Sequence, residues 1–80
     1  MWYVSMTDKF MSGWGCSEGK INKYVVECET LSEARTIERN ANKRSEMKYV
    51  NVCSRKPCYP SSTHLTTLVT YNELGEIWKL

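Results

Sequence analysis

A helix signal between segments rich in β-branched residues most constrains the fold of this chain. The sequence TLSE at residues 30–33 is a capping-box pattern, in which the Thr30 side chain accepts from the amide of Glu33 and the Glu33 side chain reaches back to the amide of Thr30. Apolar or small side chains then recur at spacings of three, three and four, at Leu31, Ala34, Ile37 and Ala41. This spacing predicts a helix to about Arg44 that packs on a sheet through one narrow stripe.

The segments around this helix have the composition of strands. β-branched and aromatic residues predict strands at residues 2–6, 21–28, 47–54 and 64–71, and a turn at 72–75 predicts a short returning edge strand at 76–80. The predicted order is ββαβββ, an α+β class with two layers: one helix packed on a mostly antiparallel sheet of four to five strands. We expect residues 1–80 to form a single domain, and the exposed edge of the last strand to offer a site for dimerisation.

A long loop is predicted between the first two strands. The sequence TDKFMSGWGCSEGK at residues 7–20 contains three of the four glycines and two large aromatic residues, Phe10 and Trp14. Long loops in small domains are usually functional or disordered, and disordered segments are poor in aromatic residues. We therefore expect Phe10 and Trp14 to anchor a partner; packing of Trp14 onto the sheet is the alternative.

The charges are distributed unevenly. Residues 1–34 carry three lysines and five acids (−2), residues 35–56 seven basic residues and two acids (+5), and residues 57–80 one lysine and two acids (−1). Arg35, Arg39 and Lys43 share one helix face, which is either a solvated face or a contact for phosphates or acidic protein side chains. The predicted partner-binding residues are Phe10, Trp14, Lys20, Arg35, Arg39, Lys43, Arg44, Arg55 and Lys56.

No set of residues predicts catalysis or a cofactor. Residues 15–19, GCSEG, match the G-x-S-x-G pattern of hydrolases, but they lie in a loop followed by a strand, and His64 is the only histidine. We expect a protein that is not an enzyme. The four cysteines are expected to be free thiols without a metal, because no Cys-x2-Cys pair is present to anchor zinc; a thiol or metal site at Cys53 and Cys58 is the alternative.

The first residues, MWYVSMTDKF, have neither the basic nor the apolar region of a secretory signal. No apolar run approaches the length of a membrane span. We therefore expect a cytoplasmic protein with reduced thiols and no membrane partner.

Three segments look like those of a group of small proteins encoded by bacteriophages and mobile elements. They are WYVSMTDKFMSGWG at the start, NAxxR at residues 40–44 and EMKYVNV at residues 46–52, and the similarity spans residues 2–59. Some compact phage proteins with a helix on an antiparallel sheet are anti-CRISPR inhibitors, which bind a CRISPR complex and obstruct recruitment of its target nucleic acid. The resemblance implies this role, in the cytoplasm of an infected bacterium, but assigns no residue a function.

Two functions are therefore expected. The first is a phage-encoded inhibitor that binds a protein complex of the host defence machinery, as a nucleic-acid mimic or competitor. The alternative is a small nucleic-acid-binding module that uses the basic central region, with Tyr24 and Tyr49 placed in strands where aromatic side chains could stack on bases.

Overall fold

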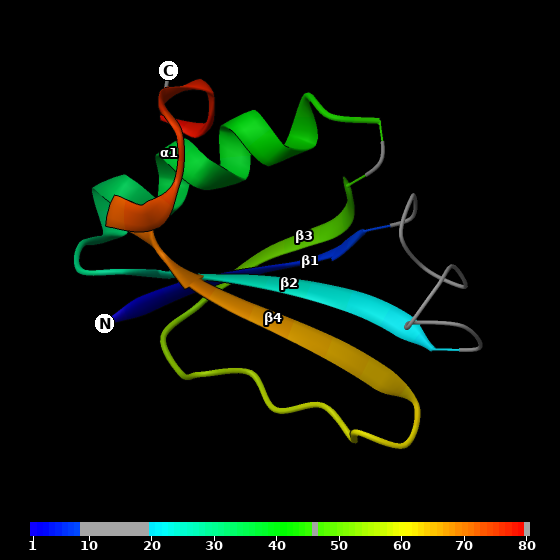
Figure 1. Ribbon diagram of the computed structural model, residues 1–80. Helices are drawn as coiled ribbons and strands as arrows, with labels where there is room; N and C mark the ends of the chain where they lie inside the picture. The colour runs from blue at the N-terminus through cyan, green and yellow to red at the C-terminus, as the bar shows by residue number, and fades with distance from the viewer. Residues whose placement is uncertain (9–19, 46, 80) are drawn as a thin grey trace.

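The computed structural model describes residues 1–8, 20–45 and 47–79 and has the predicted α+β architecture (Figure 1). One helix lies on a mixed, mostly antiparallel sheet of four strands. The elements in chain order are β1 (Trp2–Asp8), β2 (Ile21–Cys28), α1 (Leu31–Asn42), β3 (Met47–Cys53) and β4 (His64–Thr70). The long loop falls mostly on residues 9–19, so the predictions for Phe10 and Trp14 lie outside the described residues.

The strand order across the sheet is β3-β1-β2-β4. β1 is antiparallel to both of its neighbours, whereas β2 and β4 are parallel. The chain therefore places β3 and β4 at opposite edges. Because β3 and β4 lie at opposite edges, the connection between them must cross the whole sheet. The two strands also run in the same direction, so a tight turn cannot join them.

The helix begins at the predicted cap. Thr30 Oγ1 accepts from the amide of Glu33 at 3.2 Å, as the capping box predicts. The Glu33 carboxylate, however, accepts from the amide of Glu29 at 3.0 Å, one residue earlier than the pattern predicts. The helix ends at a C-cap on Lys43, two residues after Ala41.

The core lies between α1 and the sheet. Ala34, Ile37 and Ala41 are fully buried, as the stripe predicts, against strand residues and the ends of neighbouring segments: Val4, Met6, Val26, Cys28, Met47 and Leu74. Leu31 was expected in this stripe and is instead 38% exposed. It follows the N-cap directly, so its side chain lies in the first turn, to the side of the buried stripe.

The predicted turn at 72–75 and edge strand at 76–80 are wrong. Within the described residues this segment forms two 3-10 turns, Tyr71–Glu73 and Glu76–Trp78, which lie beside α1 rather than along the sheet (Figure 1). The ring of Trp78 stacks on Tyr24 with centroids 6.0 Å apart, and its carbonyl accepts from Asn40 Nδ2 at 2.7 Å. These contacts hold the segment against the helix.

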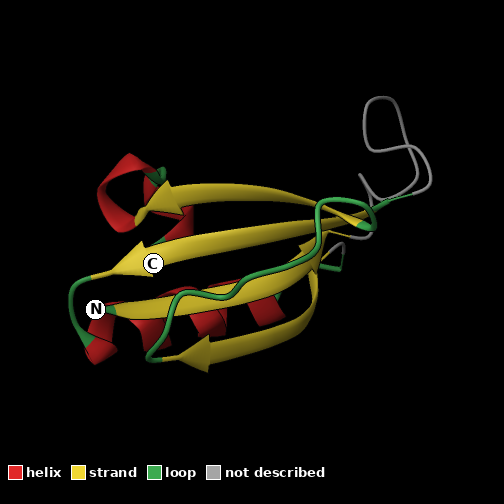
Figure 2. Cartoon of the chain, turned by 90° about the horizontal axis from the view of Figure 1, so that it is seen from below, coloured by secondary structure: helices red, strands yellow, loops and turns green. Residues whose placement is uncertain are grey.

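The face of the sheet opposite α1 is crossed by residues 54–63, as Figure 2 shows from below. Val25 points to this face, because its neighbour Val26 points into the core, yet Val25 is only 1% exposed. The connection from β3 to β4 therefore covers the second face of the sheet. No helix in the described part of the chain is long and apolar enough to cross a membrane.

Candidate partner-binding surface

The basic residues predicted to bind a partner lie in several places. Arg35, Arg39 and Lys43 are exposed on the outer surface of α1, as their spacing predicts. Arg55 and Lys56 are exposed after β3, at the end of the sheet where Tyr3 of β1 pairs with Cys53. Lys20 is half-buried immediately before β2. These residues therefore do not form a single surface.

Two of the arginines make contacts within the fold. The Arg35 guanidinium forms an ion pair with Glu38 at 3.0 Å, across one turn of α1. The Arg44 guanidinium lies 4.1 Å from the centre of the Trp78 ring, which also stacks on Tyr24. Arg44 thus contributes a cation–π contact that holds the C-terminal turns on the sheet.

The most unusual residue of the described chain is Tyr49 on the edge strand β3. Its φ angle is 55°, and it is the only described non-glycine residue with a positive φ. The register explains this value. Ser5 pairs with Asn51 and Thr7 with Lys48, so two residues of β3, at positions 49 and 50, oppose a single residue of β1. Tyr49 lies within this β-bulge, and the left-handed conformation costs roughly 1–2 kcal/mol for a residue with a Cβ.

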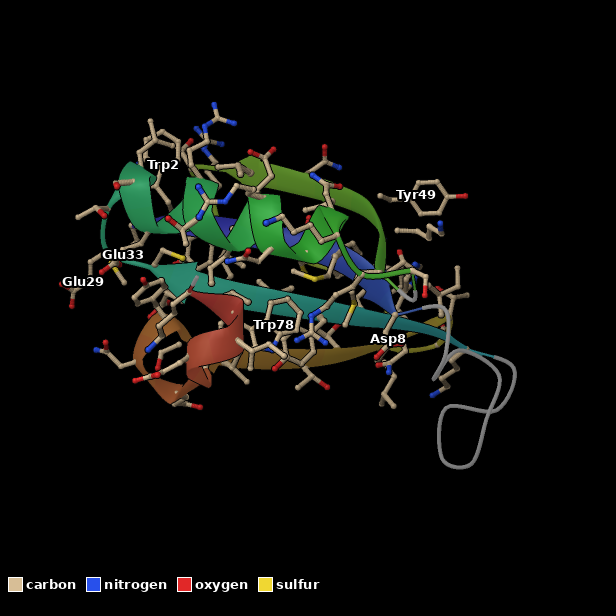
Figure 3. The ribbon with its side chains drawn as sticks, turned by 90° about the horizontal axis from the view of Figure 1, so that it is seen from above. Trp2, Asp8, Glu29, Glu33, Tyr49 and Trp78 are labelled. Carbon is tan, nitrogen blue, oxygen red and sulfur yellow. The ribbon has the colours of Figure 1, made fainter. Side chains whose placement is uncertain are left out.

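The strained backbone holds an aromatic ring in the solvent. Tyr49 is 70% exposed, the highest value among the large hydrophobic residues that are exposed. Figure 3 shows its side chain pointing outward from β3, away from α1 and the sheet. Because most of the ring is exposed, burial of the side chain offsets little of the backbone strain, and strained residues cluster at functional sites.

Basic residues lie on β3 beside Tyr49 and on the outer surface of α1, and Asp8 of β1 pairs with Met47 at the same end of the sheet. Lys48 precedes Tyr49 on the exposed edge, and α1, which carries Arg39 and Lys43 on its outer surface, packs more closely on β3 than on the other strands. The amide of Met47 donates to the carbonyl of Arg44, which brings the start of β3 to the end of α1. We call Arg39, Lys43, Lys48 and Tyr49 the α1–β3 surface.

Tyr49 was expected only as a residue that could stack on bases, together with Tyr24, and the bulge was not predicted. A signal is present: the core-facing residues Met47, Val50 and Val52 are spaced by three and then two, and a regular strand would keep a spacing of two. Tyr24 packs against the core and Trp78, so its ring is part of the fold.

Polar residues on the opposite face of the sheet are paired with one another. Lys23 Nζ donates to Thr7 Oγ1 at 2.7 Å and lies 5.1 Å from the centre of the Tyr59 ring. Partial burial lowers the pKa of Lys23 below its ordinary value. The Tyr59 ring also stacks on His64, whose Nδ1 lies 2.8 Å from Thr63 Oγ1. This arrangement fixes residues 54–63 over the sheet.

Acidic residues gather at the other end of the molecule from Tyr49. Glu27, Glu29 and Glu33 line a hollow of about 180 Å³ near Met1, and Figure 3 shows Glu29 and Glu33 at the start of α1. Glu33 is the cap residue that accepts from the Glu29 amide. The hollow is therefore part of the helix start.

The described cysteines are free thiols in different surroundings. Cys28 is buried in the core, and burial, reinforced by Glu33 and Glu27, raises the pKa of its thiol to about 11. Cys53 Sγ donates to the carbonyl of Tyr3 at 3.6 Å, and Cys58 is exposed. Residues 1–8, 20–45 and 47–79 contain no cluster of three or more His, Cys, Asp or Glu that could hold a metal ion.

Comparisons of this chain with protein-family models, with curated proteins and with solved structures found no match.

Proposed function

We propose that this chain is a binding protein that inhibits its partner, and that the α1–β3 surface makes the contact. The observation that carries the proposal is Tyr49, a strained residue whose ring is 70% exposed on a sheet edge. Tyrosine and arginine are enriched among the residues that contribute most to protein interfaces. A tyrosine fixed by the backbone also loses little freedom on binding, which favours affinity.

The partner that fits this surface is an acidic protein surface. Lys48 beside Tyr49 on β3, and Arg39 and Lys43 on the outer surface of α1, supply positive charge, so carboxylates opposite them would add specificity and speed association. The resemblance of residues 2–59 to small phage-encoded proteins supports a more specific partner, a CRISPR effector complex of an infected bacterium. In this proposal the bound chain obstructs recruitment of the target nucleic acid.

Direct binding to nucleic acid is the second candidate, and the same surface favours it. An exposed tyrosine ring can stack on an unpaired base, and the basic side chains can contact phosphates. Salt distinguishes the two candidates. Phosphate binding weakens with a log–log slope of about −0.9 for each phosphate neutralised on duplex DNA, whereas a contact anchored by a ring in a protein pocket depends less on salt.

The test is a pull-down of purified CRISPR effector complexes with the chain, followed by assay of their binding to target DNA or RNA. We expect Tyr49→Gly, which keeps the backbone conformation and removes the ring, to weaken binding roughly thirtyfold, about 2 kcal/mol. Ile77→Ala is the matched control, because Ile77 is a large exposed side chain outside the α1–β3 surface.

Full inhibition by folded Tyr49→Gly protein would contradict the assigned surface. Absence of binding to every effector complex would remove the CRISPR target, and a gel shift with the expected steep salt dependence would favour the nucleic-acid function instead.

A further inference from the structure

The two edges of the sheet differ in how they meet the solvent. β3 is interrupted by the bulge at Tyr49 and carries Lys48, and both features hinder pairing with another strand. β4 has neither feature. Its sequence HLTTLVT contains no Lys, Arg, Asp, Glu, Pro or Gly, and it pairs with β2 in unbroken register over seven residues. Such an edge is a template for a further strand.

The hydrogen bonds show which backbone groups of β4 point outward. The amide of Ile21 donates to the carbonyl of Thr63 at 3.0 Å, and Ile21 is opposite His64 in the parallel register. Backbone groups alternate in direction along a strand, so the odd-numbered residues 63–69 face β2. The N–H and C=O groups of Thr66, Leu68 and Thr70 therefore point away from the sheet, while the amide of His64 donates to Pro60.

No described segment lies along this outward edge. The sheet ends at β4, and Figure 2 shows the connection 54–63 passing over the face of the sheet rather than over its edge. Thr66 and Leu68 are exposed, and Leu68 is a large apolar side chain at 42% exposure in the middle of the outward row. The edge therefore offers both backbone hydrogen bonds and an apolar contact.

We propose that a second copy of this chain pairs antiparallel along β4, with the two-fold axis at Leu68. In this register the amide and carbonyl of Leu68 bond to those of its symmetry mate, and Thr66 is opposite Thr70 on both sides. The Leu68 side chains then meet on the face opposite α1, flanked by threonine pairs that suit antiparallel strands. The two four-stranded sheets become one sheet of eight strands, and both exposed edges are then of the β3 type.

The charges favour a second copy over an unrelated strand. Because β4 carries no Lys, Arg, Asp or Glu, two copies meet without repulsion between such side chains along the paired residues. Glu73 lies in the 3-10 turn after β4, but its carboxylate accepts from Thr70 Oγ1 at 3.1 Å, so in this register it lies near Thr66 of the other copy, two residues from His64. Each end of the paired strands therefore carries an acid from one copy and an imidazole from the other.

Sedimentation velocity and native mass spectrometry test the assembly over a wide range of protein concentration. We expect a species of twice the 9.3 kDa chain mass that dissociates on dilution. Hydrogen exchange then locates the contact: the amides of Thr66, Leu68 and Thr70 should be protected at high concentration and exchange rapidly at low concentration. The amides of Thr67 and Val69, which bond to β2, should be protected at both.

Leu68→Lys is the decisive variant and Ile77→Lys its matched control, because Ile77 is 61% exposed outside β4. We expect Leu68→Lys to raise the dimer dissociation constant about a hundredfold, since two lysines would face each other across the axis, and Ile77→Lys to leave it unchanged. Circular dichroism establishes that both variants are folded. A monomeric chain at every concentration, or a dimer in which these amides stay unprotected, overturns the proposal.

Discussion

Tyr49 shows how the partner strand can decide the conformation of a single residue. Nothing in the sequence MKYVNVC favours a left-handed tyrosine, because residues with a bulky Cβ avoid positive φ. The core requires Met47, Val50 and Val52 on one face, and only an extra residue between them satisfies that requirement. The spacing of these residues signals an extra residue in the strand, but the sequence alone does not show that Tyr49 takes the left-handed conformation.

Substitutions at Tyr49 should separate backbone strain from side-chain loss. We expect Tyr49→Val to lower the free energy of unfolding by about 1 kcal/mol or more, because a β-branched residue is the least suited to φ near 55°. Tyr49→Gly should leave stability unchanged or slightly higher, because glycine accepts this conformation freely. Urea unfolding measures the free energy of unfolding of both variants. If Tyr49→Gly is less stable than Tyr49→Val, the backbone at residue 49 is not strained.

At the scale of elements, α1 was the best-predicted part of the chain and the C-terminal segment the worst. The cap at Thr30 and the buried stripe are local patterns, so the sequence predicted both, apart from the exposure of Leu31 and the partner of Glu33. The last segment was predicted as a strand, but its structure depends on distant contacts: Trp78 contacts both Tyr24 and Arg44, and Asn40 donates to its carbonyl. Those partners cannot be inferred from neighbouring residues.

The stripe on α1 makes a quantitative prediction about the helix. Ile37 is fully buried between α1 and the sheet, so Ile37→Ala should lower the free energy of unfolding by about 2–5 kcal/mol, through lost burial and the cavity that remains. Ile77→Ala, at an exposed isoleucine, should change it by less than about 0.5 kcal/mol. Equal effects in denaturant titrations would show that α1 does not pack on the sheet through this stripe.

At the scale of the whole molecule, the sequence predicted the fold class and the layers but left the strand order open. β4 is parallel to β2 because residues 54–63 cross the sheet, and this crossing depends on Tyr59 reaching Lys23 and His64. The candidate surface was predicted in part: the exposed helix face with Arg39 and Lys43 was expected. The bulge on β3 depends on the pairing of β3 with β1, which the sequence alone does not show.

The stability of the whole molecule should depend on pH through its buried thiol. The pKa of Cys28 rises from 9.0 to about 11 on folding, so between these values the folded chain keeps a proton that the unfolded chain releases. The stabilisation linked to this proton is complete below pH 9 and is lost as pH rises toward 11, with a slope approaching about 1.4 kcal/mol per pH unit. Burial also raises the pKa of Tyr24, which likewise lowers the free energy of unfolding as pH rises. Burial lowers the pKa of Lys23, which has the opposite effect on the free energy of unfolding.

Comparison with Cys28→Ala isolates the thiol from these other groups. The variant should be less stable at neutral pH, because it leaves a small cavity in the core, but its free energy of unfolding should fall less steeply above pH 9. Urea titrations across this pH range measure both slopes. Parallel curves for the two proteins would mean that the Cys28 thiol ionises as easily in the folded chain as in the unfolded one, and that the core around it admits water.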